Sequence, residues 1–316
     1  MNLVSQAEEE APYPKLAQRK GKVMKDFRNK VAVITGGASG IGRALAERSA
    51  KAGMKVVIAD IEEGALAQAD KEMRAAGASV LAVRTDVSKA DEVQALARKT
   101  LDSFGAVHLL CNNAGVGVAA KPTWETTLED WQWCLGVNLW GVIHGIRTFV
   151  PIMLKQSAEG HVVNTASLAG LLSSPYHAIY YASKHAVVTI TESLHHELLL
   201  LDCKLKASVL LPGFTRTNIM ESYRNRAAEF GTQTADEATT VPSMLAAYRQ
   251  AVEAGFPPQF VAEQVFHAIW HEKLYIHTTT EFHELVRQRV EGIVAQKNPV
   301  IPTERLRAYG IPTAQA

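Results

Sequence analysis

The stretch VAVITGGASGIG, residues 31–42, decides how this chain folds. Its first part, 31–35, consists of apolar or β-branched residues, which is typical of a strand covered on both faces. Four glycines follow at once, namely Gly36, Gly37, Gly40 and Gly42. Glycine allows a tight turn that brings backbone amides close to a pyrophosphate, and a helix N-terminus beyond the turn favours that negative charge. The stretch predicts a strand, a turn and a helix that bind a dinucleotide, although such a turn also occurs in a purely structural role.

Short apolar runs and longer amphipathic stretches continue to alternate along the chain. Further apolar runs lie at 55–60, 79–84, 107–112, 161–167 and 206–212. The helical stretches between the runs lie at 41–53, 62–76, 89–104, 127–156 and 178–201. Strand and helix in alternation imply a parallel sheet with right-handed crossovers. The predicted fold class is therefore α/β, with a doubly wound, Rossmann-type sheet of about seven strands, three αβα layers and a single domain.

The pattern loosens after Pro212. Residues 214–258 are rich in polar and small residues, with a helix expected near 242–253. Ligands of such sheets bind beyond the carboxyl ends of the strands, so we expect 214–258 to form a substrate lid. The remaining elements are a helix, a strand that extends the edge of the sheet, and a last helix, expected at 259–270, 273–277 and 279–295.

The two ends of the chain are expected to lie outside the domain. Residues 1–24 form a polar segment with an acidic run and two prolines, which predicts a disordered N-terminal tail. The Rossmann-type domain is expected to span 25–300, and a C-terminal tail to span 301–316.

Composition limits the partners and the compartment. Lys and Arg number 33 and Asp and Glu number 32, a balance that supports neither nucleic acid nor an acidic membrane as a partner. No apolar run approaches the roughly 18 residues of a membrane span, and no secretory signal is expected. The cysteines Cys111, Cys134 and Cys203 contain no CxxC pair, which argues against a disulfide framework or a zinc site. We expect a cytoplasmic protein.

Histidine and tryptophan do not indicate a second site. His195 and His196 are adjacent on a helix and point apart, and no HExxH motif occurs, so no metal site is expected. The histidines near the C-terminus are interpreted as surface or packing residues: His271, His277 and His283. A group of tryptophans around 127–156 is interpreted as core or subunit contact rather than a cofactor site: Trp124, Trp131, Trp133 and Trp140.

An acidic residue after the glycine turn favours one dinucleotide. The second strand ends at Asp60, eighteen residues after Gly42, where a carboxylate can accept hydrogen bonds from an adenosine ribose. The same carboxylate repels the 2′-phosphate of NADP, and neither Ser39 nor Ile61 supplies a cation to hold that phosphate. The predicted cofactor is NAD. The alternative for Asp60 is a solvated strand end, or a cap for the helix that begins at 62.

Three residues further along predict acid/base chemistry. Ser167 ends a strand, and Tyr180 precedes Lys184 by four residues on a helix, so the phenol and the ammonium share one face. A free phenol has a pKa of about 10 and is a poor base near neutrality. A fixed ammonium beside it, with a positively charged nicotinamide nearby, favours the phenolate and is expected to lower that pKa. A lone YxxxK pattern also occurs on ordinary surface helices.

Taken together, these motifs resemble the short-chain dehydrogenase/reductase family. The matching segments are TGGASGIG (35–42), NNAG (112–115), Asn138, Ser167, YYASK (180–184) and PGFTRT (212–217), in the family's order between about 29 and 217. The resemblance implies that Tyr180 is the general acid/base and that Lys184 holds the nicotinamide ribose. It further implies that Ser167 binds the substrate oxygen and that Asn138 helps to hold a water in a proton relay.

The resemblance also implies a set of cofactor contacts. Asp86 and Val87 would meet the adenine, residues of the NNAG segment the central part, and Pro212, Gly213 and Thr217 the nicotinamide end. The whole implied set is Gly36, Ser39, Gly40, Ile41, Gly42, Asp60, Asp86, Val87, Asn112, Ala114, Gly115, Tyr180, Lys184, Pro212, Gly213 and Thr217. Cys111 departs from the family's usual aliphatic residue, and the chain is longer than the common form. Pairing of the 127–156 and 178–201 helices across subunits makes a homodimer or homotetramer the expected assembly.

The substrate pocket is predicted to be apolar. Its expected residues are Leu168, Leu171, Leu172, Tyr176, His177, Phe214, Ile219, Met220 and Tyr223. Arg216 and Arg224 are interpreted as exposed helix arginines rather than anion contacts. A bulky hydrophobic secondary alcohol, aromatic or cyclic, or its ketone, fits best. Looser similarity to bacterial dehydrogenases of aryl-ether Cα alcohols points the same way, while steroid and terpenoid alcohols stay open.

Two other classes of function compete with an alcohol dehydrogenase. A non-catalytic NAD-binding sensor or scaffold would be favoured by loss of Ser167, Tyr180 or Lys184, and all three are present. An isomerase or epimerase of nucleotide-linked sugars shares YxxxK but usually has a GxxGxxG loop, which this chain lacks. The sequence therefore predicts an NAD-dependent oxidoreductase, and it leaves open the substrate, the direction of the reaction and the choice between dimer and tetramer.

Overall fold

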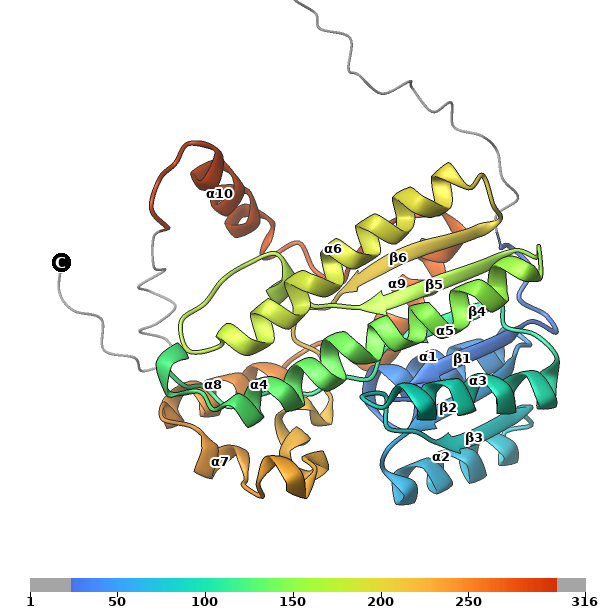
Figure 1. Cartoon of the computed structure of the whole chain (residues 1–316), viewed down its shortest axis with the longest axis horizontal. Helices are drawn as coiled ribbons and strands as arrows, with labels where there is room; N and C mark the ends of the chain where they lie inside the picture. Colours follow the sequence, from blue (N-terminus) through green and yellow to red (C-terminus); the bar gives the residue numbers. More distant parts are fainter. Residues whose placement is uncertain (1–23, 300–316) are drawn as a thin grey trace, which may run out of the picture.

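Seven parallel strands form one sheet in the computed structural model, which describes residues 24–299 (Figure 1). Their order across the sheet is β3-β2-β1-β4-β5-β6-β7. The strands are β1 (Val31–Thr35), β2 (Lys55–Asp60), β3 (Val80–Arg84), β4 (Leu109–Asn112), β5 (Gly160–Thr165), β6 (Leu205–Leu211) and β7 (Tyr275–His277). The predicted doubly wound sheet is confirmed, and the late strand extends its edge as expected.

Helices cover both faces of the sheet. One face is covered by α1 (Gly40–Lys51), α2 (Glu63–Ala75) and α9 (Pro258–Trp270). The other face, in front in Figure 1, is covered by α3 (Ala90–Phe104), α5 (Gly141–Lys155) and α6 (Ala178–Leu200). Side chains along β1 alternate between the two cores: Ala32 and Ile34 pack toward α1, whereas Val31 and Val33 pack toward α3. This double burial explains why the run is almost wholly apolar.

The strand order reverses at β1, which lies between β2 and β4. The chain leaves β1 toward one side through α1 and returns to the other side through α3 and β4. A crevice forms at such a switch point because the connections of neighbouring strands diverge there. The glycine turn after β1 and the segment after β4 therefore face one another at the carboxyl edge of the sheet.

The expected helix at 127–156 consists of three pieces. They are α4 (Leu128–Leu135), a π-helical turn η2 (Gly136–Trp140) and α5. The stretch Leu128–Lys155 is 28 residues long, and its most apolar window has a mean hydropathy of 1.3, with 39% of that window buried. It is the one helix in the described region that could cross a membrane by length and composition, which corrects the expectation that no apolar stretch is long enough. Core helices of soluble proteins share these properties, and α5 packs on the sheet through the fully buried Phe149.

Short elements form the region that the sequence predicted as a lid. They are η4 (Asn218–Asn225), η5 (Ala228–Phe230), α7 (Ala235–Ala238) and α8 (Pro242–Glu253). Figure 1 shows α7 and α8, in orange, beside α4, and side chains of α4, η4, α7 and α8 share one apolar cluster. The remaining elements are η1 (Thr123–Glu125), η3 (Leu168–Gly170) and α10 (His283–Val294).

Near both ends of the described region the observed elements differ in detail from the expected ones. The last helix begins at His283 rather than at 279, because the residue before it, Phe282, is buried against the sheet. Met24 is also buried and belongs to the domain core, although the sequence assigned it to the tail. The predicted tails at 1–23 and 301–316 lie outside the described residues.

One glycine on α5 permits close packing of this helix on β4. A Cβ atom at Gly145 would overlap the side-chain amide of the buried Asn112. We expect Gly145→Ala to lower the free energy of unfolding by about 1–3 kcal/mol, since overpacking forces the helix away from the sheet. Gly64 of α2 has no neighbour within 4 Å of such an atom, so Gly64→Ala is expected to raise stability by about 0.5–1 kcal/mol. Urea unfolding of both variants measures the contrast, and equal effects would contradict this account.

Candidate active site

A cavity of about 340 Å³ opens along the carboxyl edge of the sheet. Its wall includes a residue at or directly after the end of each of the first six strands: Gly36, Asp60, Thr85, Asn113, Ala166 and Pro212. The cavity runs from the glycine turn and Asp60 at one end to Ser167, Tyr180 and the lid at the other. Residues predicted to bind the cofactor and residues predicted to act in acid/base chemistry therefore line the same cavity.

The glycine turn has the geometry that an anion site needs. Gly36 and Gly40 have φ values of 63° and 54°, in the left-handed region that favours glycine. The N-cap of α1, Ser39, makes no side-chain capping bond, and no acidic residue lies in the first turn. Nothing in the local sequence therefore neutralises the positive end of this helix, which favours a bound anion. Ser39, Gly40 and Ile41 line the cavity as expected.

Gly42 does not line the cavity in the described structure, although the sequence assigned it to the cofactor site. A Cβ atom there would overlap the carbonyl oxygen of Gly36 and lie 2.6 Å from Nδ2 of Asn113. Its role is to let α1 begin directly against the turn. A glycine motif does not reveal which of its members face the ligand and which face the protein, so a contact of Gly42 with the cofactor stays a prediction.

Asp60 both lines the cavity and holds the backbone around it. Its carboxylate accepts hydrogen bonds from the amides of Ala38, at 3.0 Å, and Glu62, at 3.1 Å. Burial raises the pKa of Asp60, and these amide bonds oppose that rise. The two roles that the sequence suggested for Asp60, a ribose ligand and a cap of the local backbone, are therefore both consistent with its position.

Arg224, which the sequence suggested to be an exposed helix arginine, lies at the same end of the cavity and is indeed exposed. Arg224 of η4 lines the wall, and its Nη2 lies 2.6 Å from Oε1 of Glu62. The guanidinium thus has an anionic partner from the protein. The hydrogen bond from Arg224, the largest cause, lowers the pKa of Glu62, so the pair is charged at neutral pH. The spacing of 162 residues between the two explains why sequence alone did not pair them.

The segment after β4 separates two neighbouring asparagines. Asn112 does not belong to the described cavity wall, because its side chain turns into the sheet and its Nδ2 donates to Oδ1 of Asn164 at 2.8 Å. Its neighbour Asn113 lines the wall instead, together with Ala114 and Gly115. The alternation of side chains along a strand was the signal that could have separated the two asparagines. Asp86, Val87, Pro212, Gly213 and Thr217 line the cavity as predicted.

Ser167, Tyr180 and Lys184 share one part of the wall. Ser167 follows β5 and caps η3, its hydroxyl accepting from the amide of Ala169 at 3.1 Å. Tyr180 lies in the first turn of α6 and Lys184 one turn later, with its Nζ 5.6 Å from the centre of the phenol ring. The ammonium of Lys184 donates a hydrogen bond to the carbonyl of Thr165 at 3.1 Å, which fixes the orientation of the side chain.

Burial dominates the electrostatics of these groups. It raises the pKa of Tyr180 to about 12, against a smaller opposing effect of a hydrogen bond with Ser167. It lowers the pKa of Lys184 to about 8, since an ammonium loses hydration energy in an apolar interior. Desolvation of the phenol is thus the dominant effect on the pKa of Tyr180 within the protein itself, and the expected lowering of this pKa by Lys184 together with a positively charged nicotinamide stays a prediction. A further positive charge is needed to favour the phenolate.

Asn138 lies behind the wall rather than on it. It is fully buried in the π-helical turn η2, where its Oδ1 accepts from the amide of Val116 at 2.8 Å. Its Nδ2 donates to the carbonyl of Val116 at 3.0 Å and to the hydroxyl of Ser183 at 3.3 Å. The side chain therefore ties the segment after β4 to α6, and its role in holding a water stays a prediction.

The lid end of the cavity is apolar and aromatic. Of the predicted pocket residues, Leu168, Leu172, His177, Phe214, Ile219, Met220 and Tyr223 line it, whereas Leu171 and Tyr176 do not. The sequence missed four aromatic wall residues: Trp133, Tyr181, Tyr248 and Phe282. Their positions depend on how α4, α6, α8 and the segment before α10 converge, which no local pattern reveals.

Few charged side chains line the lid end of the cavity. His177 packs 4.7 Å from the ring of Tyr248, and burial lowers its pKa to about 4, so the imidazole is neutral. Lys184 and Arg224 are the cations among the described wall residues, and Arg224 is held by Glu62. A carboxylate or phosphate on the substrate would find little to bind here, whereas an apolar ring system would be surrounded by aromatic side chains.

The remaining candidates from the sequence form no further site. Within residues 24–299 no group of three or more His, Cys, Asp or Glu side chains is arranged to hold a metal ion. The rings of His195 and His196 lie 5.9 Å apart, and those of His277 and His283 lie 4.7 Å apart. Trp124 is 85% exposed, which excludes it from the described core.

Comparison with known proteins identifies the family. The short chain dehydrogenase family model matches residues 30–228. A dehydrogenase/reductase of CLA biosynthesis from Lactiplantibacillus plantarum is 34% identical over 280 residues, which cover 87% of this chain and 97% of that protein. A C alpha-dehydrogenase from a Sphingobium species is 33% identical over 278 residues, which cover 88% of this chain and 89% of that protein.

A solved structure is similar over almost its whole length. The short-chain dehydrogenase/reductase from Burkholderia phymatum, crystallised in complex with NAD, has a TM-score of 0.84 and 47% identity, and the match covers 88% of this chain and 99% of that one. This chain therefore belongs to the short-chain dehydrogenase family. It is an oxidoreductase that acts on alcohols or ketones, with a Rossmann-type nucleotide-binding fold.

The buried ammonium makes stability depend on pH in a defined direction. The pKa of Lys184 is about 8 in the folded protein against 10.5 for the free side chain. Between these values the unfolded chain binds more protons, so the free energy of unfolding rises with pH in that window. We expect Lys184→Met to be more stable than the parent at pH 7, by about 1–3 kcal/mol, and this gain to shrink as the pH rises from 8 toward 10.5.

Urea unfolding at pH 7 and pH 10, without added nucleotide, measures this difference. The matched control is Lys99→Met, which removes a lysine from the exposed surface of α3 instead of from the interior. A gain for Lys184→Met that is constant or grows with pH would show that the ammonium is not destabilised by burial.

Proposed function

We propose that this protein is an NAD-dependent dehydrogenase that interconverts a hydrophobic secondary alcohol, aromatic or cyclic, and its ketone. The observation that carries the proposal is the common cavity. It places Ser167, Tyr180 and Lys184 between a dinucleotide-type turn and an apolar aromatic chamber. Relatives that are dehydrogenases, one of them a C alpha-dehydrogenase, support the same class of reaction.

The residues at the first end of the cavity fit NAD. The open N-terminus of α1 and the turn Gly36–Ile41 would hold the pyrophosphate, and Asp60 would accept from the adenosine ribose. Arg224 is bound to Glu62 and thus offers no unpaired cation to a 2′-phosphate. Asp86 and Val87 would border the adenine. Ala114, Gly115, Lys184, Pro212, Gly213 and Thr217 would hold the rest of the molecule. When bound, oxidised NAD supplies a positive charge and a carbon, C4 of the nicotinamide, that accepts hydride.

Side chains of the protein then transfer the proton and bind the substrate oxygen. In oxidation Tyr180 accepts the hydroxyl proton, and in reduction it returns that proton to the alkoxide. Ser167 donates a hydrogen bond to the same oxygen and stabilises the charge that develops there. The Lys184 ammonium, held by Thr165, adds positive charge below the phenol. Tyr180 needs these neighbouring groups to lose its proton, because burial alone keeps the pKa of its phenol near 12.

We further propose a cytoplasmic location and a homodimer or homotetramer. Apolar side chains remain exposed at the end of α6 and beside α5. Leu200 is 75% exposed and Trp140 is 49% exposed. Exposed apolar groups of this size on two neighbouring helices are suited to burial between copies of the chain.

Replacement of the phenol tests the assignment of Tyr180. A panel of aryl, steroid and terpenoid secondary alcohols with NAD, followed by NADH absorbance, first identifies a substrate of the parent protein. We then expect Tyr180→Phe to lower kcat by about 10²–10⁴-fold without weakening NAD binding, because general acid/base transfer is lost. Tyr181→Phe removes the hydroxyl of the next residue and is expected to keep most of the turnover. Near-parental turnover of a folded Tyr180→Phe variant would refute the mechanism.

Removal of the charge at Asp60 tests the choice of cofactor. We expect Asp60→Asn to lower the ratio of kcat/KM with NAD to that with NADP by about tenfold or more, since repulsion of the 2′-phosphate disappears. Steady-state kinetics with both nucleotides at a fixed alcohol concentration measures this ratio. Glu62→Gln, which changes the neighbouring carboxyl bound to Arg224, serves as the comparison. A parent protein that prefers NADP would refute the assignment.

A further inference from the structure

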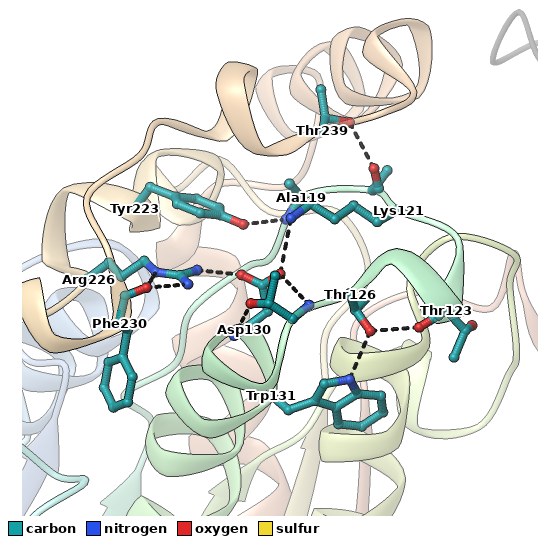
Figure 2. Close-up of polar contacts among 12 residues, drawn as sticks. Ala119, Lys121, Thr123, Thr126, Asp130, Trp131, Tyr223, Arg226, Phe230 and Thr239 are labelled. Carbon is teal, nitrogen blue, oxygen red and sulfur yellow. Dashed lines mark hydrogen bonds and ion pairs between the residues drawn. The ribbon is translucent and has the colours of Figure 1, made fainter.

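Three charged side chains meet in the interior beside the lid (Figure 2). They are Lys121 in the segment after β4, Asp130 in the first turn of α4, and Arg226 directly after η4. Nη1 of Arg226 lies 2.6 Å from Oδ1 of Asp130, and Nζ of Lys121 lies 3.1 Å from Oδ2. The side chains of Arg226, Asp130 and Lys121 are only 1%, 3% and 11% exposed. The sequence analysis singled out none of them.

Every polar group of this cluster that Figure 2 draws has a defined partner. Oδ2 of Asp130 also accepts from the amide of Thr127 at 3.2 Å, and Nε and Nη2 of Arg226 donate to the carbonyl of Phe230 at 3.0 and 2.6 Å. Hydrogen bonds from Arg226 and Lys121 lower the pKa of Asp130 against the effect of its burial, so the carboxylate is charged. A buried charge is tolerated only when it is paired in this way, and removal of one partner leaves the others unmatched.

The cluster lies directly behind the substrate end of the cavity. The guanidinium carbon of Arg226 is 5.2 Å from the ring centre of Trp133 and 5.6 Å from that of Tyr223. These two rings pack against each other at 5.1 Å, and both line the cavity. The hydroxyl of Tyr223 also accepts from the amide of Ala119, as Figure 2 shows. A shift of Arg226 would therefore move two wall residues.

Two segments far apart in the sequence are joined through the one carboxylate. Lys121 belongs to the segment 116–121, and Arg226 belongs to the lid, 96 residues after Asp130. Additional contacts bridge the same two segments: the amide of Gly117 donates to Ser222 at 3.0 Å, and Thr239 donates to the carbonyl of Ala120 at 3.0 Å. These are neutral bonds. Two residues before Arg226, Arg224 forms an ion pair with Glu62 whose side chains are 36% and 26% exposed, so this pair is weakened by solvent.

We propose that Asp130 is a positioning residue of the substrate pocket. Its carboxylate holds the lid, through Arg226, and the segment 116–121, through Lys121, at a fixed separation. It thereby fixes the rings of Trp133 and Tyr223 as the wall against which an apolar substrate binds. Asp130 lies behind these rings and acts on the substrate only through them. The kinetic part of this proposal rests on the proposed function, whereas the attachment of the lid does not.

Hydrogen exchange of the backbone tests the attachment without any substrate. Asp130→Asn keeps the size of the side chain and an oxygen for the Thr127 amide but removes the charge. We expect amides in 218–240 and 116–121 to exchange about tenfold faster or more in this variant, while those of β1, β4 and β5 keep the parental rate. Thr127→Ala is the matched control: it removes the hydroxyl that accepts from the Asp130 amide at 3.2 Å, and so loosens α4 without discharging the cluster.

Kinetics with alcohols of two sizes separates positioning from stability. We expect Asp130→Asn to raise KM for 1-(2-naphthyl)ethanol by about tenfold and that for 1-phenylethanol less, with kcat changed by less than about threefold and NAD affinity unchanged. The double variant Asp130→Asn/Arg226→Gln replaces the charged pair by a neutral one and is expected to recover part of both the exchange protection and the KM. If Asp130→Asn does not fold, Arg226→Lys, which keeps the charge but loses the fork to Phe230, is measured by the same criteria.

Two results would overturn the proposal. Parental exchange in 218–240 for Asp130→Asn would show that the cluster does not hold the lid. Equal acceleration in Asp130→Asn and Thr127→Ala would reduce Asp130 to a helix cap. A parent protein that oxidises none of the alcohols would instead contradict the proposed function, and the exchange experiment would still decide whether Asp130 attaches the lid.

Discussion

Close contact between the ends of β1 and β4 is the constraint on which the rest of the site depends. The hydroxyl of Thr35 accepts from the amides of Asn113, at 2.9 Å, and Ala114, at 3.1 Å. A Cβ atom at Gly36 would lie only 2.9 Å from Cα of Ala114, so this approach requires glycine. The two connections then diverge, one into α1 and the other along the segment that passes Asn138 and reaches Lys121. The cavity is the space between them, which is why this one contact positions both of its ends.

Burial shifts the pKa values of the ionisable side chains in this cavity, and it also lowers the stability of the fold. A phenol and an ammonium lie in the same apolar wall, and desolvation shifts the pKa of each toward its neutral form. Functional sites commonly keep such unfavourable groups because the rest of the fold stabilises them. Here the support is local and specific: Thr165 binds the ammonium, and the fully buried Asn138 binds both backbone groups of Val116 beside it. An added positive charge in the cavity would shift the phenol back toward the reactive form.

The lid is attached near its start by two ion pairs of different character, one formed by Arg224 and the other by Arg226. The pair of Arg224 and Glu62 is partly exposed, and such pairs contribute about 0–1 kcal/mol. The cluster around Asp130 is buried and hydrogen-bonded on all sides, so its geometry is far more restrictive. The attachment through Arg226 is therefore the more rigid of the two. A rigid, aromatic wall suits discrimination by shape, whereas few charges are present to discriminate by polarity.

Sequence periodicity and spacing determined the strands, the switch point, the family and the position of Tyr180 and Lys184, because each of these depends on residues that are neighbours along the chain. A buried strand must be apolar, and a separation of four must place two side chains on one helix face. The tertiary structure alone decided that Asn113 rather than Asn112 faces the cavity, since the packing of Gly145 on β4 turns Asn112 inward. The tertiary structure alone also decided the high pKa of Tyr180 and the contact of Asp130 with Lys121 and Arg226. Desolvation and charge pairing depend on distances in space between segments that are far apart in the sequence, and no local pattern relates such segments.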